Sequence, residues 1–259
     1  MECCVEKIRG WRRSNKLKLN DDKTEIVLVL PKHLKQGNLP DIKIGDSLIT
    51  PSSHARNIGI IFDDTMTMDK QITATCQAAN FQIRRIGRIR KYLTFDAAKT
   101  VVHAYVTSRL DDGNALLVGL HKNQRKKMQH TQNAAARLIT FAKKYDHITP
   151  VLKQLHWLPI EMRIIYKICL LAYKAQHDLA PAYLCSLLKP YSPQRSLRSN
   201  KKNLLDEHRT GNKYGGMAFE NAAPKLTNIL PQDIRQASSL ESFKSALKTC
   251  LFRRYFDAV

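Results

Sequence analysis

Residues 155–184 read LHWLPIEMRIIYKICLLAYKAQHDLAPAYL, the densest block of apolar and aromatic residues in the chain. Pro159 lacks an N–H but loses nothing by this in the first turn of a helix, and Glu161 places negative charge at the positive end of the helix dipole. An apolar stripe at three- and four-residue spacing follows, made of Ile164, Ile165, Ile168, Leu171, Ala172 and Ala175. The pattern predicts one amphipathic helix that begins at Pro159 and ends by Pro181.

The composition is that of a folded globular protein. The chain has 259 residues, 43% of them hydrophobic and 25% charged, which is enough to build two or more compact units. No window approaches the roughly 18 unbroken apolar residues that a membrane span needs, and the N-terminal MECCVEKIRGWRR lacks the apolar core of a signal peptide. We therefore expect an intracellular protein, nuclear or cytoplasmic, with no membrane partner.

The six cysteines give no sign of a metal site or a disulfide framework. They are scattered, with no C-x-x-C pair and no histidine at zinc-finger spacing. We expect reduced thiols and no bound cofactor.

The charge is strongly positive, with 43 Lys and Arg against 22 Asp and Glu and a net charge of +21. It is also uneven, since residues 66–145 carry 15 basic and only 4 acidic side chains. A field of this sign attracts polyanions, so the composition favours RNA or DNA as the partner and points to the middle of the chain.

Residues 1–65 predict a small α/β unit. The pattern indicates a helix over 5–14, a turn at 20–22 and a strand over 25–30 that Pro31 ends. Strands at 42–44 and 47–49 flank a Gly45-Asp46 turn, and a third strand carries Ile58, Ile60 and Phe62 in alternation. A small antiparallel sheet is expected.

From residue 66 onward the pattern is helical. Three helices are predicted at 73–93, 95–110 and 123–141, the second with Thr94 as its N-cap. In the first, Ile83, Ile86, Ile89 and Leu93 are expected to be buried, opposite Arg84, Arg85, Arg88 and Lys91. In the third, the expected inner residues are Met128, Ala135, Leu138 and Ala142, and the outer ones are Arg125, Lys126, Gln129, Gln132 and Arg137.

The chain is thus expected to be α+β, mostly α. Residues 190–216 lose periodicity and gain Pro, Ser, Gly and basic residues, as a connector does. A last helix should begin at Ser238 with Glu241 at capping-box spacing and bury Leu240, Phe243, Leu247 and Leu251. The predicted segments are 1–65, 66–145, 146–189, 190–216 and 217–259.

Several blocks resemble, in order, the end of the reverse transcriptase of LINE-type, non-LTR retrotransposons, in their Jockey-like and chicken-repeat-like branches. Besides 155–184 they are WRRSNKLKLNDDKTEIVLV (11–29), RNIGIIFDD (56–64), SRLDDGNALLVGL (108–120), QNAAARLIT (132–140), RSLRS (195–199), AFENAAPKLTNILP (218–231) and SFKSALKTCLF (242–252). The resemblance implies the end of the palm at 1–65, the thumb at 66–145 and the family's C-terminal region beyond. It also implies an RNA-directed DNA polymerase whose Mg²⁺ belongs to the intact enzyme.

The catalytic aspartates that the family needs are not evident. The family's pair follows an aromatic and one small residue on a hairpin, with a third Asp on an earlier strand that helps hold two metal ions. The adjacent pairs here are Asp21-Asp22, Asp63-Asp64 and Asp111-Asp112, and none has that context, so turn and cap roles are expected for them. We expect a truncated, inactive piece with no catalytic residue of its own.

Holding nucleic acid is what remains, since phosphate contact needs long cationic side chains on a rigid face. The candidate binding residues are Arg84, Arg85, Arg88, Lys91, Arg125, Lys126 and Lys127. Ser196, Arg198, Lys201 and Lys202 are either a second contact or part of a linker. Tyr92, Tyr105 and Tyr145 are expected in the core or an interface rather than stacked on bases, and His156 and Trp157 are expected to pack rather than bind a ligand.

Two alternatives stay open. The basic surface could instead dock acidic proteins, with contacts through exposed apolar residues of 160–184. The chain could also be a decayed element product that folds poorly.

Overall fold

The computed structural model describes residues 2–17, 20, 23–29, 41–44, 47–192, 203–211 and 213–257. The chain forms two compact units, residues 1–74 and 75–259. The structure is mostly helical (62%), and the described strands form two antiparallel sheets of two strands each. This confirms the α+β, mostly α fold expected from the sequence.

The first unit contains both sheets. Its elements are α1 (Glu2–Ser14), β1 (Ile42–Ile44), β2 (Ser47–Ile49), β3 (His54–Asn57), β4 (Ile60–Asp63) and the start of α2 (Asp69–Ile89). The predicted β1–β2 hairpin is present, with Ile42 opposite Ile49. The turn residues Gly45 and Asp46, and the pair Asp21-Asp22, lie outside the described residues.

The prediction of a strand over residues 25–30 is wrong, since the described residues 25–29 contain no strand. Only one bridge forms there, between Val27 and Ser52, supported by a 2.8 Å bond from the Ser52 N–H to the Ile26 carbonyl. Pro51, next to Ser52, has no N–H with which to extend a ladder. The alternating pattern therefore yields a single bridge instead of a strand.

The predicted third strand is shorter than expected at its start. Ile58 and Gly59 form the two-residue turn between β3 and β4, in which Asn57 faces Ile60. Their φ angles are +47° and +84°, and positive φ at both central positions is the requirement of a type I′ turn. Ile58 therefore lies in the turn and not in a strand, and it is 95% exposed.

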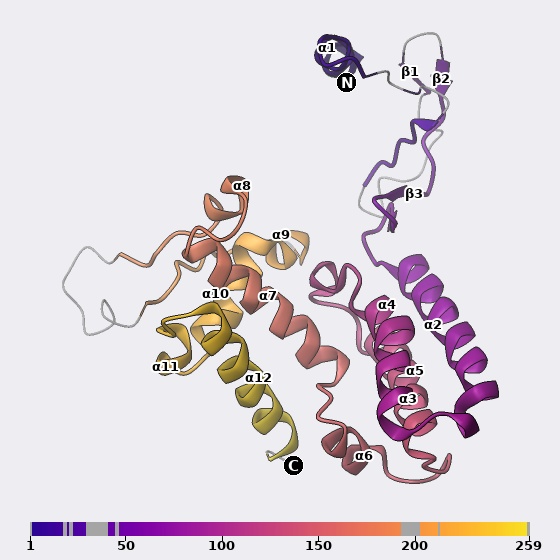
Figure 1. The fold of residues 1–259 in the computed structure, drawn as a ribbon. Coiled ribbons are helices and arrows are strands. Elements are labelled where there is room, and N and C mark those ends of the chain that lie inside the picture. The colour runs from indigo at the N-terminus through magenta and orange to yellow at the C-terminus, as the bar shows by residue number, and fades with distance from the viewer. Residues whose placement is uncertain are drawn as a thin grey trace. The chain divides into compact units, whose positions relative to one another are not determined.

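The second unit is built from helices (Figure 1). Its elements after α2 are η3 (Arg90–Tyr92), α3 (Phe95–Val102), the π-helical turn η4 (His103–Thr107), α4 (Ser108–Asp111), η5 (Asn114–Leu117), α5 (Lys122–Thr140), α6 (Ile148–Gln154), α7 (Ile160–Gln176), α8 (Ala182–Cys185), α9 (Lys213–Met217), α10 (Phe219–Asn228), α11 (Gln232–Arg235) and α12 (Leu240–Phe256).

The three predicted middle helices are all present. Thr94 caps α3 as expected, its hydroxyl accepting from the Ala97 N–H at 3.3 Å. The segment from α3 through η4 to α4 is continuous, and the sequence pattern did not reveal its π-helical turn.

The α2 and α5 helices run parallel. Asn80 donates to Thr131 at 3.4 Å, and a Cβ built on Gly87 would lie 3.8 Å from Leu138, so the sequence numbers rise together along both helices. In both contacts the α5 residue is numbered 51 higher than the α2 residue beside it. This alignment shows which part of α2 lies next to each basic residue of α5.

The prediction that Ile89 is buried is wrong, because Arg90 takes the buried position. Arg90, 5% exposed, donates from Nε to the Leu138 carbonyl at 2.9 Å and from Nη2 to the Ile139 carbonyl at 2.5 Å. Its guanidinium also lies 4.2 Å from the centre of the Phe141 ring. The last carbonyls of α5 have no partner within their own helix, so Arg90 supplies one and carries positive charge to the negative end of the dipole.

The α7 helix is the predicted one. It begins at Ile160, directly after Pro159, but ends at Gln176, five residues before Pro181. Ile164, Ile168, Ala172 and Ala175 are buried as expected, whereas Ile165 and Leu171 are only half-buried.

The core of α7 is shared with the C-terminal helices. Cys169 and Tyr173 of α7 pack with Leu230, Ile234, Phe243, Leu247 and Leu251. Ser239, not Ser238, caps α12, its hydroxyl accepting from the Ser242 N–H at 3.2 Å. Of the four residues predicted to be buried there, Leu240 alone is half-buried.

Arg90→Met should destabilise the second unit by about 2–4 kcal/mol, because two α5 carbonyls would lose a charged donor inside the core. The measurement is the urea midpoint followed by helical circular dichroism. Arg88→Met, two residues earlier at the end of α2 and exposed, is the matched control and should change stability by less than about 0.5 kcal/mol. Equal midpoints for the two variants would contradict the capping role.

Candidate nucleic-acid interface

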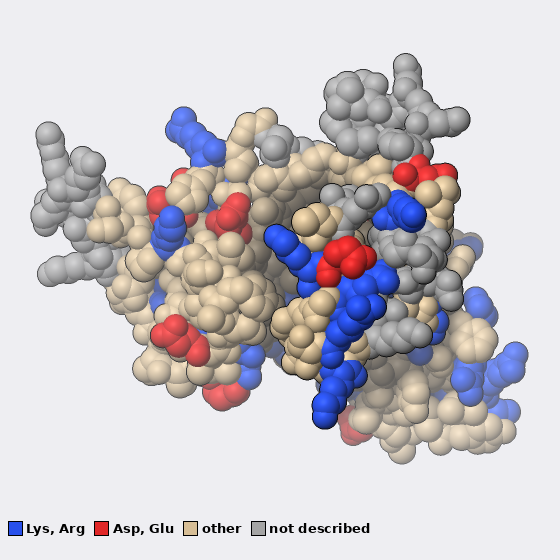
Figure 2. Space-filling model, turned by 90° about the horizontal axis from the view of Figure 1, so that it is seen from above, with Lys and Arg blue, Asp and Glu red and all other residues tan. Residues whose placement is uncertain are grey.

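The α2 basic group comprises Arg84, Arg85 and Arg88 of α2 and Lys91 of the η3 turn directly after it, and all four are exposed. They lie opposite the buried face of the helix, as the spacing predicted. Residues 70–95 contain no Asp or Glu, so the sequence around this group offers no carboxylate to offset its charge. Figure 2 shows, on the face that it draws, Lys and Arg in several groups with Asp and Glu between some of them.

The α5 basic group comprises Arg125, Lys126 and Lys127, near the N-terminus of that helix. Lys126 and Lys127 are exposed, but Arg125 is half-buried and pairs with Glu161 of α7. Arg125 ends the first turn of α5, and Lys126 and Lys127 lie in the second turn, where the effect of the helix dipole has fallen off. The group raises the positive potential near this end of the helix.

Lys122 belongs with the α5 basic group in space but was not among the predicted residues. It is the first residue of α5 and is exposed. The signal in the sequence was the absence of Asp and Glu from residues 113–145, within which Lys122 falls.

The two basic groups do not merge into one cluster. The electrostatic influence of Lys127 on Cys76 places the α5 basic group beside the early part of α2. At 1.5 Å per residue, the cations of the α2 basic group lie about 12 to 20 Å along the helix from Cys76, and therefore from the α5 basic group. Phosphates along one strand of a duplex recur every 3.4 Å or so, so the two basic groups are separated by roughly four to six phosphates.

Aromatic side chains flank the α2 basic group. Phe81 is exposed with Arg85 5.8 Å from its ring centre, and Tyr92 is 76% exposed with Lys91 at 4.8 Å. Tyr105 and Tyr145 are exposed as well. Tyr92, Tyr105 and Tyr145 were expected in the core or an interface, and their exposure shows that none of the three lies in the core.

The other predicted contacts cannot be placed. Ser196, Arg198, Lys201 and Lys202 lie outside the described residues.

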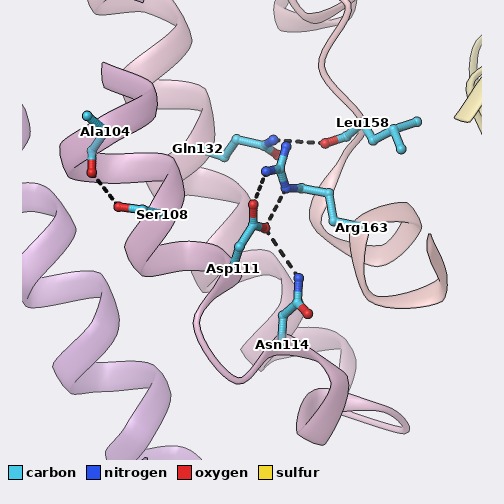
Figure 3. Close-up of polar contacts among 7 residues, drawn as sticks. All are labelled: Ala104, Ser108, Asp111, Asn114, Gln132, Leu158 and Arg163. Carbon is cyan, nitrogen blue, oxygen red and sulfur yellow. Dashed lines mark hydrogen bonds and ion pairs between the residues drawn. The ribbon is translucent and has the colours of Figure 1, made fainter. Parts of the chain in front are cut away.

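Asp111 is an ion-pair partner, not a cap. Its two carboxylate oxygens accept from Arg163 of α7, with Nε at 2.8 Å from Oδ1, and Oδ1 also accepts from Asn114 Nδ2 at 3.3 Å (Figure 3). The Arg163 side chain is only 16% exposed. Two parallel bonds of this kind are strong and directional, so the pair orients α7 against α4.

Gln132 and Gln129, predicted on the outer face of α5, instead join α5 to the start of α7. Gln132 is buried and donates to the Leu158 carbonyl at 2.9 Å, as Figure 3 shows. Gln129 accepts from the Ile160 N–H at 2.9 Å and donates to Gln132 at 2.9 Å. Pro159 has no side-chain acceptor for the first N–H of α7, and Gln129 provides one.

Asp63, the nearest mimic of a catalytic aspartate, holds a turn together. Oδ1 accepts from the backbone and hydroxyl of Thr65 at 3.1 and 2.6 Å and from those of Thr67 at 2.9 and 3.2 Å. Oδ2 accepts from the Met68 N–H at 2.6 Å. Burial acts to raise the pKa of Asp63, but these hydrogen bonds outweigh it and hold the pKa below its usual value.

The described residues contain no group of three His, Cys, Asp or Glu side chains placed to hold a metal ion. Within the same part of the chain, no helix is both long and apolar enough to cross a membrane. Comparisons with protein-family models, curated proteins and solved structures find no match to this chain.

The turn after β4 should loosen in acid. Because the folded pKa of Asp63 is depressed, its stabilising effect is present above the unfolded pKa of about 3.9 and is lost as the pH falls through the folded value. Hydrogen exchange of the Thr67 and Met68 amides, corrected for intrinsic rates, should therefore show protection that declines below about pH 4. Asp63→Asn should lower the protection at pH 7 and remove its acid dependence. Acid-dependent protection that persists in Asp63→Asn would contradict this role.

Proposed function

We propose that the chain binds the sugar–phosphate backbone of RNA or DNA through the α2 basic group and through Lys126 of the α5 basic group, and that it corresponds to the end of a non-LTR retrotransposon reverse transcriptase without catalytic activity of its own. The observation that carries the binding proposal is the α2 basic group, in which Arg84, Arg85 and Arg88 extend from one helix and the exposed Lys91 follows on η3. The ordered sequence blocks support the family assignment.

Phosphate binding needs cations that are not already occupied. Arg90, Arg125 and Arg163 are engaged inside the fold, so their charge does not distinguish a binding surface from a structural one. The α2 basic group differs, because its side chains extend from a helix whose opposite face is packed. Cations held on a rigid element meet phosphates with little ordering cost, and contacts of this kind carry no sequence preference.

The exposed rings fit the same role. Phe81 and Tyr92 lie at the two ends of the α2 basic group, where they can stack on unpaired bases at about 1–3 kcal/mol per base. A surface that is cationic in the middle and aromatic at both ends suits a junction between paired and unpaired strands.

The absence of catalysis is proposed from what the aspartates do. Asp63 is saturated with hydrogen bonds and Asp111 is paired with Arg163. Both carboxylates therefore stabilise the folded structure, and we assign neither of them a catalytic role.

Docking of an acidic protein is the second candidate. The apolar stripe of α7 that would have served it is buried or half-buried, which leaves Leu179 and Tyr183 as the large exposed apolar residues of 160–184. This small remainder makes helix-groove docking the weaker proposal.

The triple variant Arg84→Gln/Arg85→Gln/Arg88→Gln should weaken duplex and hybrid binding by roughly 10- to 100-fold at 100 mM salt. The slope of log affinity against log salt should fall by about 0.9 for each phosphate that the variant no longer neutralises. Filter binding across a salt series measures both. The matched control removes three exposed cations elsewhere in the same unit, Lys225→Gln/Arg253→Gln/Arg254→Gln, and should change neither quantity by much.

Affinity that is insensitive to salt, or equally weakened binding in the two triple variants, would contradict the proposed surface. The same preparations should give no primer extension with Mg²⁺, and synthesis above background would overturn the non-catalytic part of the proposal. A protein partner that survives nuclease treatment and no longer binds Leu179→Ser/Tyr183→Ser would favour acidic-protein docking instead.

A further inference from the structure

The second unit contains a cavity of about 420 Å³, within the size range of small-molecule sites. The α3–η4 segment, the turn at 155–158, α7 and α12 form its walls. Trp157, Leu158 and Leu170 give it an apolar part, and Tyr166 adds a ring with a hydroxyl. A planar apolar group fits such a lining.

The charged lining is cationic. Lys99, Lys167 and Lys248 line the cavity with Arg163, and Asp111 is the one carboxylate among the described lining residues. Both oxygens of Asp111 are taken by Arg163. The three lysines therefore leave an excess of positive charge, which favours an anionic group on the ligand.

Two buried polar atoms on the lining residues lack partners. Trp157 and Asn114 are 3% and 5% exposed, and Trp157 Nε1 and Asn114 Oδ1 have no hydrogen-bond partner in the part of the chain that the structure describes. Asn114 Nδ2 donates to Asp111, and because a carboxylate only accepts, the Asn114 oxygen must be the unpaired atom. Each of these two atoms exposes less than 1 Å² to solvent, so both belong to the packed wall of the cavity, where an unpaired group costs about 1–3 kcal/mol.

The wall beside Trp157 has an unusual backbone. His103 begins the π-helical turn η4, and its ring meets Trp157 edge-on, with centroids 5.6 Å apart. Single π-helical turns inside α-helices are frequent at functional sites. Burial, then the charge of Arg163, lowers the pKa of His103, so near neutral pH its ring keeps one donor and one acceptor nitrogen.

These features define one ligand. It carries an anionic group for the lysines and a flat ring for the apolar part. A nucleotide combines the two, since its phosphate is anionic and its base is a flat ring that stacks on aromatic side chains.

We propose that this cavity binds a single nucleotide unit, with its phosphate among Lys99, Lys167 and Lys248 and its base against the apolar part formed by Trp157, Leu158 and Leu170. The inference rests on the proposed nucleic-acid function, which it deepens by naming the part of a strand that the cavity takes. A free nucleoside monophosphate and the 5′-phosphorylated end of a strand share this chemistry.

Calorimetric titration of the full chain with AMP tests the proposal. AMP should bind at least about tenfold more tightly than adenosine or inorganic phosphate, since each of these probes lacks one of the two recognised groups. Lys167→Gln/Lys248→Gln removes two exposed lining cations and should raise the Kd for AMP by roughly 5- to 20-fold. The Kd for adenosine should not change in this variant.

The matched control, Lys174→Gln/Arg254→Gln, removes one cation from each of the same two helices away from the cavity and should bind AMP like the unaltered chain. Absence of AMP binding at millimolar concentration, equal Kd values for AMP and adenosine, or equally weakened binding in the two double variants would overturn the proposal. Competition by a 5′-phosphorylated trinucleotide would support it with a strand end as the ligand. AMP binding without that competition would support it with the free nucleotide.

The α2 triple variant separates the two proposals. It should weaken duplex binding while leaving the Kd for AMP unchanged, so failure of the basic surface and failure of the cavity give different results.

Discussion

The ion pair between Asp111 and Arg163 is the contact on which the helical unit depends. It ties the end of α4 to the first turn of α7, and the Gln129–Gln132 amides hold the same turn from α5. The rest of α7 contacts α8, α10 and α12, so the shared core of Cys169, Tyr173 and the C-terminal helices is placed by this attachment. The Asp111 side chain is 37% exposed, so water screens the pair, and removing one member should cost less than the roughly 3–5 kcal/mol of a fully buried pair.

The positive charges of the helical unit fall into two classes, those bonded to oxygen atoms of the fold and those exposed on its surface. Arg90, Arg125, Arg137 and Arg163 all donate to carbonyl or carboxylate oxygens of the fold. These bonds use the planar guanidinium group, which Lys cannot imitate. The α2 basic group, by contrast, is exposed, and its charge is neither offset by neighbouring acids in sequence nor needed to hold a helix end. A folded domain gains little from such a group unless an anion binds it.

The sequence predicted well what depends on periodicity and local capping. The helix at 155–184, the middle helices, the Thr94 cap and the β1–β2 hairpin follow from apolar spacing and turn residues. It failed where a side chain reaches a distant backbone group. Arg90 and Gln132 occupy buried positions because each satisfies a carbonyl more than 20 residues away, and no local pattern records such a partner. Ile58 was assigned to a strand because alternation cannot show where a two-residue turn falls.

For the candidate site, charge counting found the exposed cations but could not separate Arg125, which pairs with Glu161, from its neighbours. The cavity beside Trp157 was missed entirely, since its lining comes from segments far apart in the chain.

The central claim is that the exposed cations of α2 and α5 meet nucleic-acid phosphates while cations elsewhere on the helical unit do not. Lysine acetylation footprinting, read by mass spectrometry with and without an RNA–DNA hybrid at low salt, tests it most directly. Lys91 and Lys126 should be protected by the hybrid, and Lys225 on α10 should react at the same rate in both samples. Equal protection of all three lysines, or none at Lys91 and Lys126, would contradict the account.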